Sequence, residues 1–178
     1  MNTYVSYFRD IAVRNKRILH NPANEGTAAQ KGTCKFALFS EDDVATKSGT
    51  AVSEGAMLFL HQYDWSLSDN EAGDLRKIFA AGFMVTRATK IDDVDDQEAA
   101  YNECEEIVDE IFAQMRADSI SPSFQSPLGI IDWNAVSISP IGGLWGQQRY
   151  GWWVEFTFQK KNRTIDKPAT LSAAFLPR

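Results

Sequence analysis

The stretch from Leu128 to Lys161 constrains the fold most, because it holds most of the chain's tryptophans and its clearest strand pattern. Apolar and polar residues alternate from Trp152 to Gln159, as in a strand with one buried face. A second strand is expected over Asn134–Ser139, with Val136 and Ile138 directed inward. A loop that contains Pro140, Gly142, Gly143 and Gly146 joins the two segments. The stretch therefore predicts an antiparallel strand pair with a long connection. The inner face of the strand from Trp152 to Gln159 carries Trp152, Val154, Phe156 and Phe158.

Length and composition favour one globular domain over residues 1–178. The chain has 178 residues, 44% of them hydrophobic and 24% charged, which suits a single packed core. Proteins that bind the phosphate backbone of nucleic acids usually carry an excess of basic residues, whereas this chain has a net charge of −6. Specific nucleic-acid binding is therefore not expected. An apolar run of transmembrane length and a signal-like N-terminus are both missing, so we expect no membrane partner and assembly in the cytoplasm.

The remaining pattern predicts helices and strands joined by two long loops. Residues 23–33 and 41–54 are polar, rich in small residues and aperiodic, which predicts mobile loops. Connections of that length are uncommon inside a small domain and suit arms that reach a partner. The expected elements are a helix from Thr3 to about Leu19, a strand over Cys34–Ser40, hairpin strands over Ala56–Trp65 and Arg76–Thr89 with a turn at Ser66–Asp74, and a helix from Asp96 to about Ala117.

The long helix has the strongest helical pattern in the chain. Its apolar residues recur every three or four positions and predict a face that packs on the sheet. The acidic segment Ile91–Glu98 precedes it, but its carboxylates do not follow the spacing of a calcium loop. We therefore interpret Asp95 and Glu98 as a capping box at the start of the helix. The packing face is expected to carry Tyr101, Cys104, Val108, Ile111, Phe112 and Met115.

The sequence predicts no catalytic, cofactor-binding or metal-binding residue. His20 and His61 lie too far apart in the sequence for a paired metal motif, and neither accompanies a nucleophile motif. Cys34 and Cys104 form no CxxC pair, and no phosphate-binding glycine loop occurs. We therefore expect the protein not to be an enzyme. A basic cluster at Lys160, Lys161, Arg163 and Lys167 is interpreted as a solvated strand end, with contact to an acidic neighbour as the alternative.

Four stretches carry a resemblance to a known family: Tyr4–Phe39, Tyr63–Asn70, Phe83–Ile111 and Gly151–Phe158. Together they resemble the small tail-completion and tail-terminator (head–tail connector) proteins of tailed bacteriophages, especially versions from phages of Bacteroides-type hosts or from phage-like particles. The resemblance implies an α+β fold in which a twisted antiparallel sheet is backed by an N-terminal helix and one long central helix. It also implies a virion protein that forms a homo-oligomeric ring with tail tube, sheath or connector proteins as partners, and DNA passing through the ring.

An interface guess follows from the aromatic loop between the last two strands. Leu144, Trp145, Arg149 and Tyr150 could anchor contacts between subunits, because aromatic and arginine side chains dominate such contacts. The alternative function is a binding module for a small ligand or protein. In that case an apolar cavity would be lined by Trp145, Tyr150 and Trp152.

Overall fold

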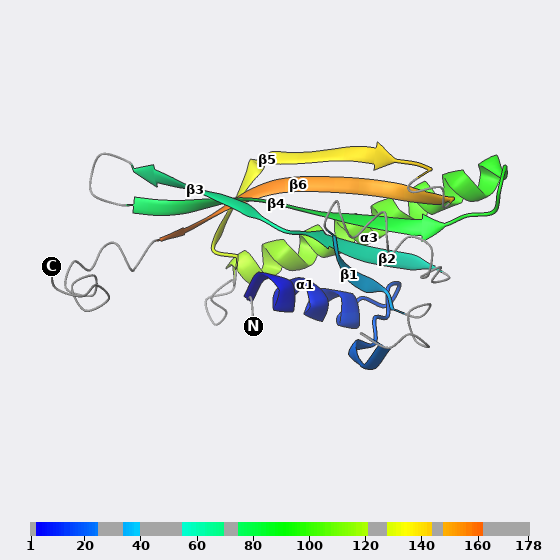
Figure 1. Cartoon of the computed structure of the whole chain (residues 1–178), viewed down its shortest axis with the longest axis horizontal. Coiled ribbons are helices and arrows are strands. Elements are labelled where there is room, and N and C mark those ends of the chain that lie inside the picture. The colour runs from blue at the N-terminus through cyan, green and yellow to red at the C-terminus, as the bar shows by residue number, and fades with distance from the viewer. Residues whose placement is uncertain are drawn as a thin grey trace, which may run out of the picture.

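The computed structural model describes residues 3–24, 34–39, 55–69, 75–120, 128–143 and 148–161. Within these residues, a six-stranded sheet is covered on one face by helices α1 (Thr3–Arg14) and α3 (Val94–Ile120) (Figure 1). The predicted α+β fold with an N-terminal helix and a long central helix is confirmed. The other elements are η1 (Pro22–Asn24), β1 (Phe36–Phe39), β2 (Ala56–His61), β3 (Asp64–Asp69), β4 (Leu75–Ala88), β5 (Ile130–Ile141) and β6 (Arg149–Lys161).

Strand β4 organises the sheet. The strand order is β1-β2-β4-β6-β5, and β3 also pairs with β4. All of these pairs are antiparallel except β1 with β2, so the sheet is mixed rather than wholly antiparallel as predicted. A parallel pair needs a connection of a dozen or more residues, and residues 40–55 supply that length. The predicted antiparallel pairing of the last two strands is confirmed.

The predicted hairpin differs from the structure at its tip. The first strand, expected over Ala56–Trp65, ends at His61, and β3 follows after a break of two residues. The segment predicted as a turn therefore begins as a strand, because Trp65 and Leu67 alternate with serines and pair with the first half of β4. Figure 1 shows that β3 and the start of β4 extend beyond the two helices.

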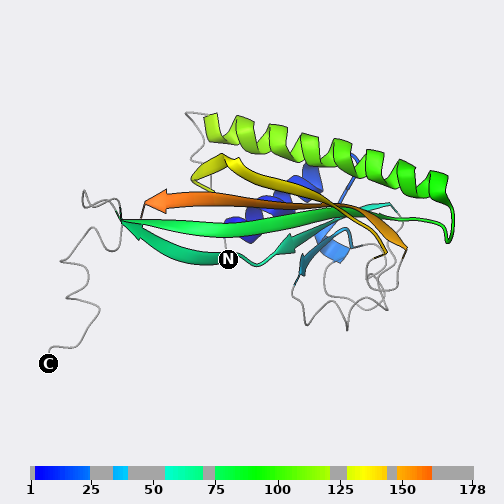
Figure 2. The same ribbon diagram turned by 90° about the horizontal axis from the view of Figure 1, so that it is seen from above.

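Both helices pack on the same face of the sheet. α3 runs lengthwise along the sheet (Figure 2), and the predicted packing face is confirmed, with Tyr101 and Phe112 partly buried and the other four residues buried. The predicted inner face of β6 is also confirmed, since Val154, Phe156 and Phe158 are buried and Trp152 packs against the core. α1 contributes Tyr4, Tyr7, Phe8, Ile11 and Ala12 to this core.

The helix ends differ from the predicted positions. α1 ends at Arg14 rather than Leu19, because the side chain of Asn15 accepts hydrogen bonds from the backbone N–H groups of Arg17 (2.9 Å) and Ile18 (3.0 Å). At the start of α3, Asp93 Oδ1 accepts the backbone N–H of Asp96 at 3.0 Å. Asp93 is therefore the N-cap, and the capping box predicted at Asp95 is wrong by two residues.

Strand β5 forms an edge of the sheet. The prediction placed Val136 and Ile138 inside, but Val136 is only half-buried and Ile138 is exposed. A bulge between Asp132 and Ser137 interrupts the pairing with β6, so the strict alternation expected from the sequence does not hold. The predicted mobile loops at 23–33 and 41–54 lie outside the described residues, apart from the last two residues of η1.

Candidate interaction surfaces

One candidate surface lies where β3, β4 and β6 extend past the helices. Trp65 and Leu67 of β3 are 55% and 50% exposed there. In the strand register, Leu67 lies opposite Lys77 of β4, and Lys77 lies opposite Lys160 of β6. Residues opposite each other share a face of the sheet, so these side chains form one surface. We call Trp65, Leu67, Lys77 and Lys160 the basic–aromatic end.

The lysines of this end rest on aromatic rings. Lys77 Nζ lies 4.5 Å from the ring centre of Trp65, and Lys160 Nζ lies 5.6 Å from that of Phe158. Such cation–π contacts orient both ammonium groups. Directly opposed like charges destabilise a strand pair, and burial lowers the pKa of Lys160. An anion placed against this end would therefore relieve local repulsion.

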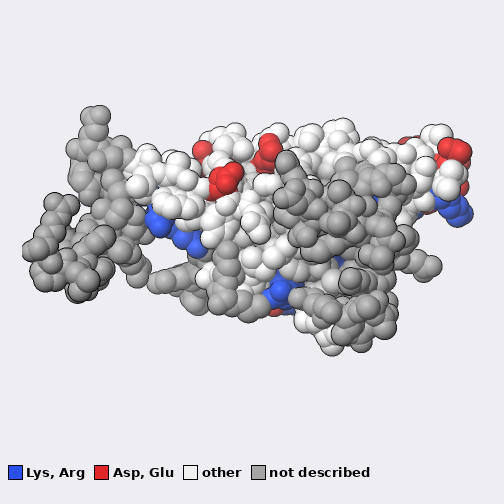
Figure 3. All heavy atoms as spheres, in the orientation of Figure 1, with Lys and Arg blue, Asp and Glu red and all other residues white. Residues whose placement is uncertain are grey.

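A second candidate surface lies at the other end of the long axis, where α3 begins. Ile91 and Val94 are 74% and 71% exposed there, and Asp92, Asp95 and Glu98 are exposed as well. Carboxylates favour the positive end of a helix dipole, which accounts for their place in the first turns. We call these five residues the acidic end. Figure 3 shows Asp and Glu atoms there at the right, with Lys or Arg atoms beside them.

Not every acidic group near the start of α3 is available to a partner. Asp96 forms an ion pair with Arg87 and accepts the backbone N–H of Lys90 at 2.8 Å, and Glu103 Oε2 accepts from Arg87 Nη1 at 3.0 Å. Asp93 caps the helix. These contacts fix the turn between β4 and α3, so the exposed residues of the acidic end stand on a rigid support.

The predicted interface residues do not form one surface in the described part of the chain. Leu144 and Trp145 lie outside the described residues. Tyr150 is partly buried and packs its ring 5.8 Å from that of Tyr101. Arg149, one of the predicted interface residues, is only 1% exposed in the chain. It begins β6, and its guanidinium donates from Nε to Thr86 Oγ1 (3.1 Å) and from Nη2 to the Thr86 carbonyl (3.0 Å).

Burial shifts the pKa values of two neighbouring groups in opposite directions. Desolvation lowers the pKa of Arg149 to about 10. Desolvation, followed by the nearby charge of Glu103, raises the pKa of the Cys104 thiol to about 12. Burial also raises the pKa values of Tyr4 and Tyr7. Cys104 is therefore held as a neutral thiol and behaves as a packing residue.

The raised pKa of Cys104 predicts a loss of stability at high pH. The thiol of the unfolded chain loses its proton above its ordinary value of 9.0, whereas the folded thiol keeps it up to about pH 12. Stability should fall by about 1 kcal/mol per pH unit in this window. Urea unfolding at a series of pH values should therefore show a shallower decline for Cys104→Ala. Equal slopes in the wild type and in Cys104→Ala would contradict the prediction.

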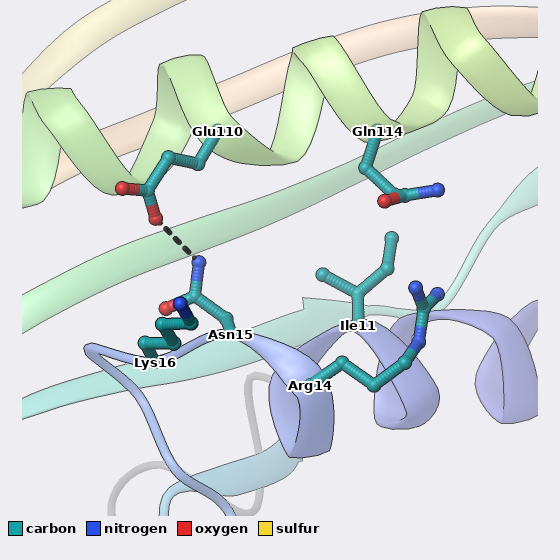
Figure 4. Close-up of a pocket in the computed structure, with 6 residues that line it drawn as sticks. All are labelled: Ile11, Arg14, Asn15, Lys16, Glu110 and Gln114. Atoms are coloured by element: carbon teal, nitrogen blue, oxygen red, sulfur yellow. Dashed lines mark hydrogen bonds between the residues drawn. The ribbon is translucent and has the colours of Figure 1, made fainter.

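Tyr150 and Trp152, two of the three aromatic residues proposed to line a cavity, instead pack between α3 and the sheet, whereas Trp145 lies outside the described residues. Trp152 Nε1 donates to the Tyr101 carbonyl at 3.0 Å, and its ring lies 5.7 Å from that of Tyr101. A pocket of about 250 Å³ lies elsewhere, between α1 and α3 (Figure 4). Glu110 on its wall already accepts hydrogen bonds from Asn15 (2.8 Å) and Arg17 (3.2 Å). Its lining residues are Ile11, Arg14, Asn15, Lys16, Glu110 and Gln114, none of them aromatic.

His61 packs among aromatic rings on the sheet face away from the helices. Its ring lies 5.8 Å from that of Phe39 and 5.5 Å from that of Trp153. These contacts give His61 a packing role.

Among the residues that the structure describes, no group of three or more His, Cys, Asp or Glu side chains could hold a metal ion. In the same part of the chain, no helix is both long and apolar enough to span a bilayer.

Sequence reasoning missed both ends as surfaces. The sequence predicts a basic strand end after Gln159, but it places Trp65 at the end of a strand, Leu67 in a turn, and Ile91 and Val94 at a helix start. The alternation from Asp64 to Asp69 was the available signal for a strand.

Scans against protein-family models, curated proteins and solved structures found no match to the chain.

Proposed function

We propose that the chain is a structural subunit of a phage or phage-like tail, which forms a homo-oligomeric ring at the tail end or the head–tail junction. The resemblance of Tyr4–Phe39, Tyr63–Asn70, Phe83–Ile111 and Gly151–Phe158 suggests this identity. The geometric observation that carries an assembly role is the placement of exposed apolar side chains. Most of those in the described residues lie on β3, on β5 and at the start of α3.

The edge strand β5 supports contact through side chains. Ile130, Trp133 and Ile138 are exposed along it. An open edge can also pair with another chain through its backbone, but bulges and prolines limit such pairing. β5 contains both a bulge and Pro140. We therefore expect β5 to contribute apolar contacts over a limited length, which suits a closed assembly better than an endless sheet.

Several separate apolar surfaces on one chain favour a ring. When one surface of a subunit contacts a different surface of the next copy, the assembly closes into a ring if the rotation divides a full circle. β3 and β5 lie on opposite sides of the central strands β4 and β6, and the turn before α3 lies at the far end of β4. The binding-module alternative receives less support, because Tyr150 and Trp152 pack against Tyr101.

The proposed function is tested in the particle whose genome encodes the chain. Deleting its coding sequence should give heads and tails that fail to join, or tails of abnormal length. Complementation with a tagged copy should restore infectivity and place the tag at the tail end or the head–tail junction in electron micrographs. Normal particles without the chain, or a tag absent from purified particles, would overturn the proposal.

A further inference from the structure

We infer that the basic–aromatic end of one copy docks onto the acidic end of the next copy. This inference rests on the proposed self-association and assigns the surfaces that make it. The two ends lie at opposite ends of the long axis (Figures 1 and 3), so they cannot contact each other within one chain. Contact between them therefore requires a second copy.

The two ends match in apolar character. The basic–aromatic end exposes Trp65 and Leu67, and the acidic end exposes Ile91 and Val94. Large apolar side chains exposed in pairs and flanked by charge are typical of protein interaction surfaces. Docking would remove all four from water. Trp65 is the expected anchor, because tryptophan in the centre of an interface often contributes most of the binding energy.

The two ends also match in charge. Lys77 and Lys160 face each other across β4 and β6, and carboxylates between them would turn repulsion into attraction. Asp95 and Glu98 are exposed on the first turns of α3 and can supply those carboxylates. Lys90 is also exposed near this end, but Asp92, Asp95 and Glu98 outnumber it. Complementary charge of this kind orients the partners and fixes which surfaces meet.

A second copy fits this end better than a nucleic acid. Lysines beside an exposed aromatic ring can bind single-stranded nucleic acid as well. A chain with a net charge of −6, however, repels a polyanion at long range. The acidic end offers both the anions and the apolar side chains that the basic–aromatic end matches, and it is present on every copy.

Paired charge reversals test the contact. K77E/K160E alone should weaken self-association in sedimentation by at least about tenfold, because an acidic surface would then face the acidic end. D95K/E98K alone should do the same through two basic surfaces. An equimolar mixture of the two variants should assemble again, since each altered end then meets its complement. K16E/R116E, which reverses one exposed cation just after α1 and one on α3, should assemble like the wild type.

The outcomes separate this inference from the proposed function. Circular dichroism verifies that each variant folds. If K77E/K160E does not fold, K77Q/K160Q takes its place. Wild-type assembly that persists in folded K77E/K160E overturns the docking of these ends and leaves the ring proposal standing. If K77E/K160E assembles normally but loses binding to a labelled DNA oligonucleotide, the docking is likewise overturned and the ring proposal still stands. A wild-type chain that never self-associates, alone or with tail proteins, overturns both.

Discussion

Phe83→Ala is expected to lower the free energy of unfolding by about 3 to 5 kcal/mol, the range for truncating a buried phenylalanine. Phe83 is fully buried at the middle of β4. Its ring lies 5.5 Å from Phe8 of α1, 6.1 Å from Phe112 of α3 and 6.2 Å from Phe156 of β6. The substitution therefore opens a cavity at the point where both helices meet the sheet.

Urea unfolding measured by circular dichroism tests this expectation. Phe83→Leu retains most of the apolar volume and should cost about 1.5 kcal/mol or less. Leu67→Ala, a truncation on exposed β3, should change stability by about 0.5 kcal/mol at most. If Phe83→Ala cost no more than Leu67→Ala, the placement of the core between the helices and β4 would be wrong.

Gly151→Ala is expected to cost about 3 kcal/mol, at the upper end for overpacking a core. A Cβ atom at this position would lie 2.0 Å from the Val85 carbonyl oxygen and 2.9 Å from the Thr86 Cα. Both are backbone atoms of β4, which pairs with β6 here, so neither can rotate away. The strands would have to separate at the centre of the sheet, and the thermal midpoint should fall accordingly.

Gly143→Asn provides the matched control for Gly151→Ala. Gly143 has a φ of +66°, and no heavy atom of the described residues lies within 4 Å of an added Cβ. Asparagine tolerates this left-handed conformation better than most residues, so the change should stay within about 0.5 kcal/mol. Equal thermal midpoints for Gly151→Ala and Gly143→Asn would show that the close approach of β6 to β4 is not as described.

The elements that could be predicted from the sequence are those with a sustained period. The alternation from Trp152 to Gln159 placed the inner face of β6 correctly, and the apolar recurrence from Tyr101 to Met115 placed that of α3. The sequence predicts a turn from Ser66, although β3 continues to Asp69, because serines and aspartates are common in turns. The end of α1 was missed because the hydrogen bonds of Asn15 compete with helix continuation, which a periodic pattern does not reveal.

The candidate surfaces were less predictable than the fold. Arg149 looked like a loop residue, but the start of β6 buries it beside Thr86. Lys77 and Lys160 are far apart in the sequence, and only the register of β4 with β6 places them opposite each other. A surface that spans three strands depends on pairing, which composition and local alternation do not determine.

The mass of the purified chain in solution, followed from low micromolar to hundreds of micromolar, tests the central claim most directly. Sedimentation velocity gives that mass, and negative-stain images reveal the shape of any large species. The account predicts a monomer that gives way to closed rings as concentration rises, or that joins rings when tail proteins are added. A strict monomer at every concentration, which also ignores tail proteins, would contradict it.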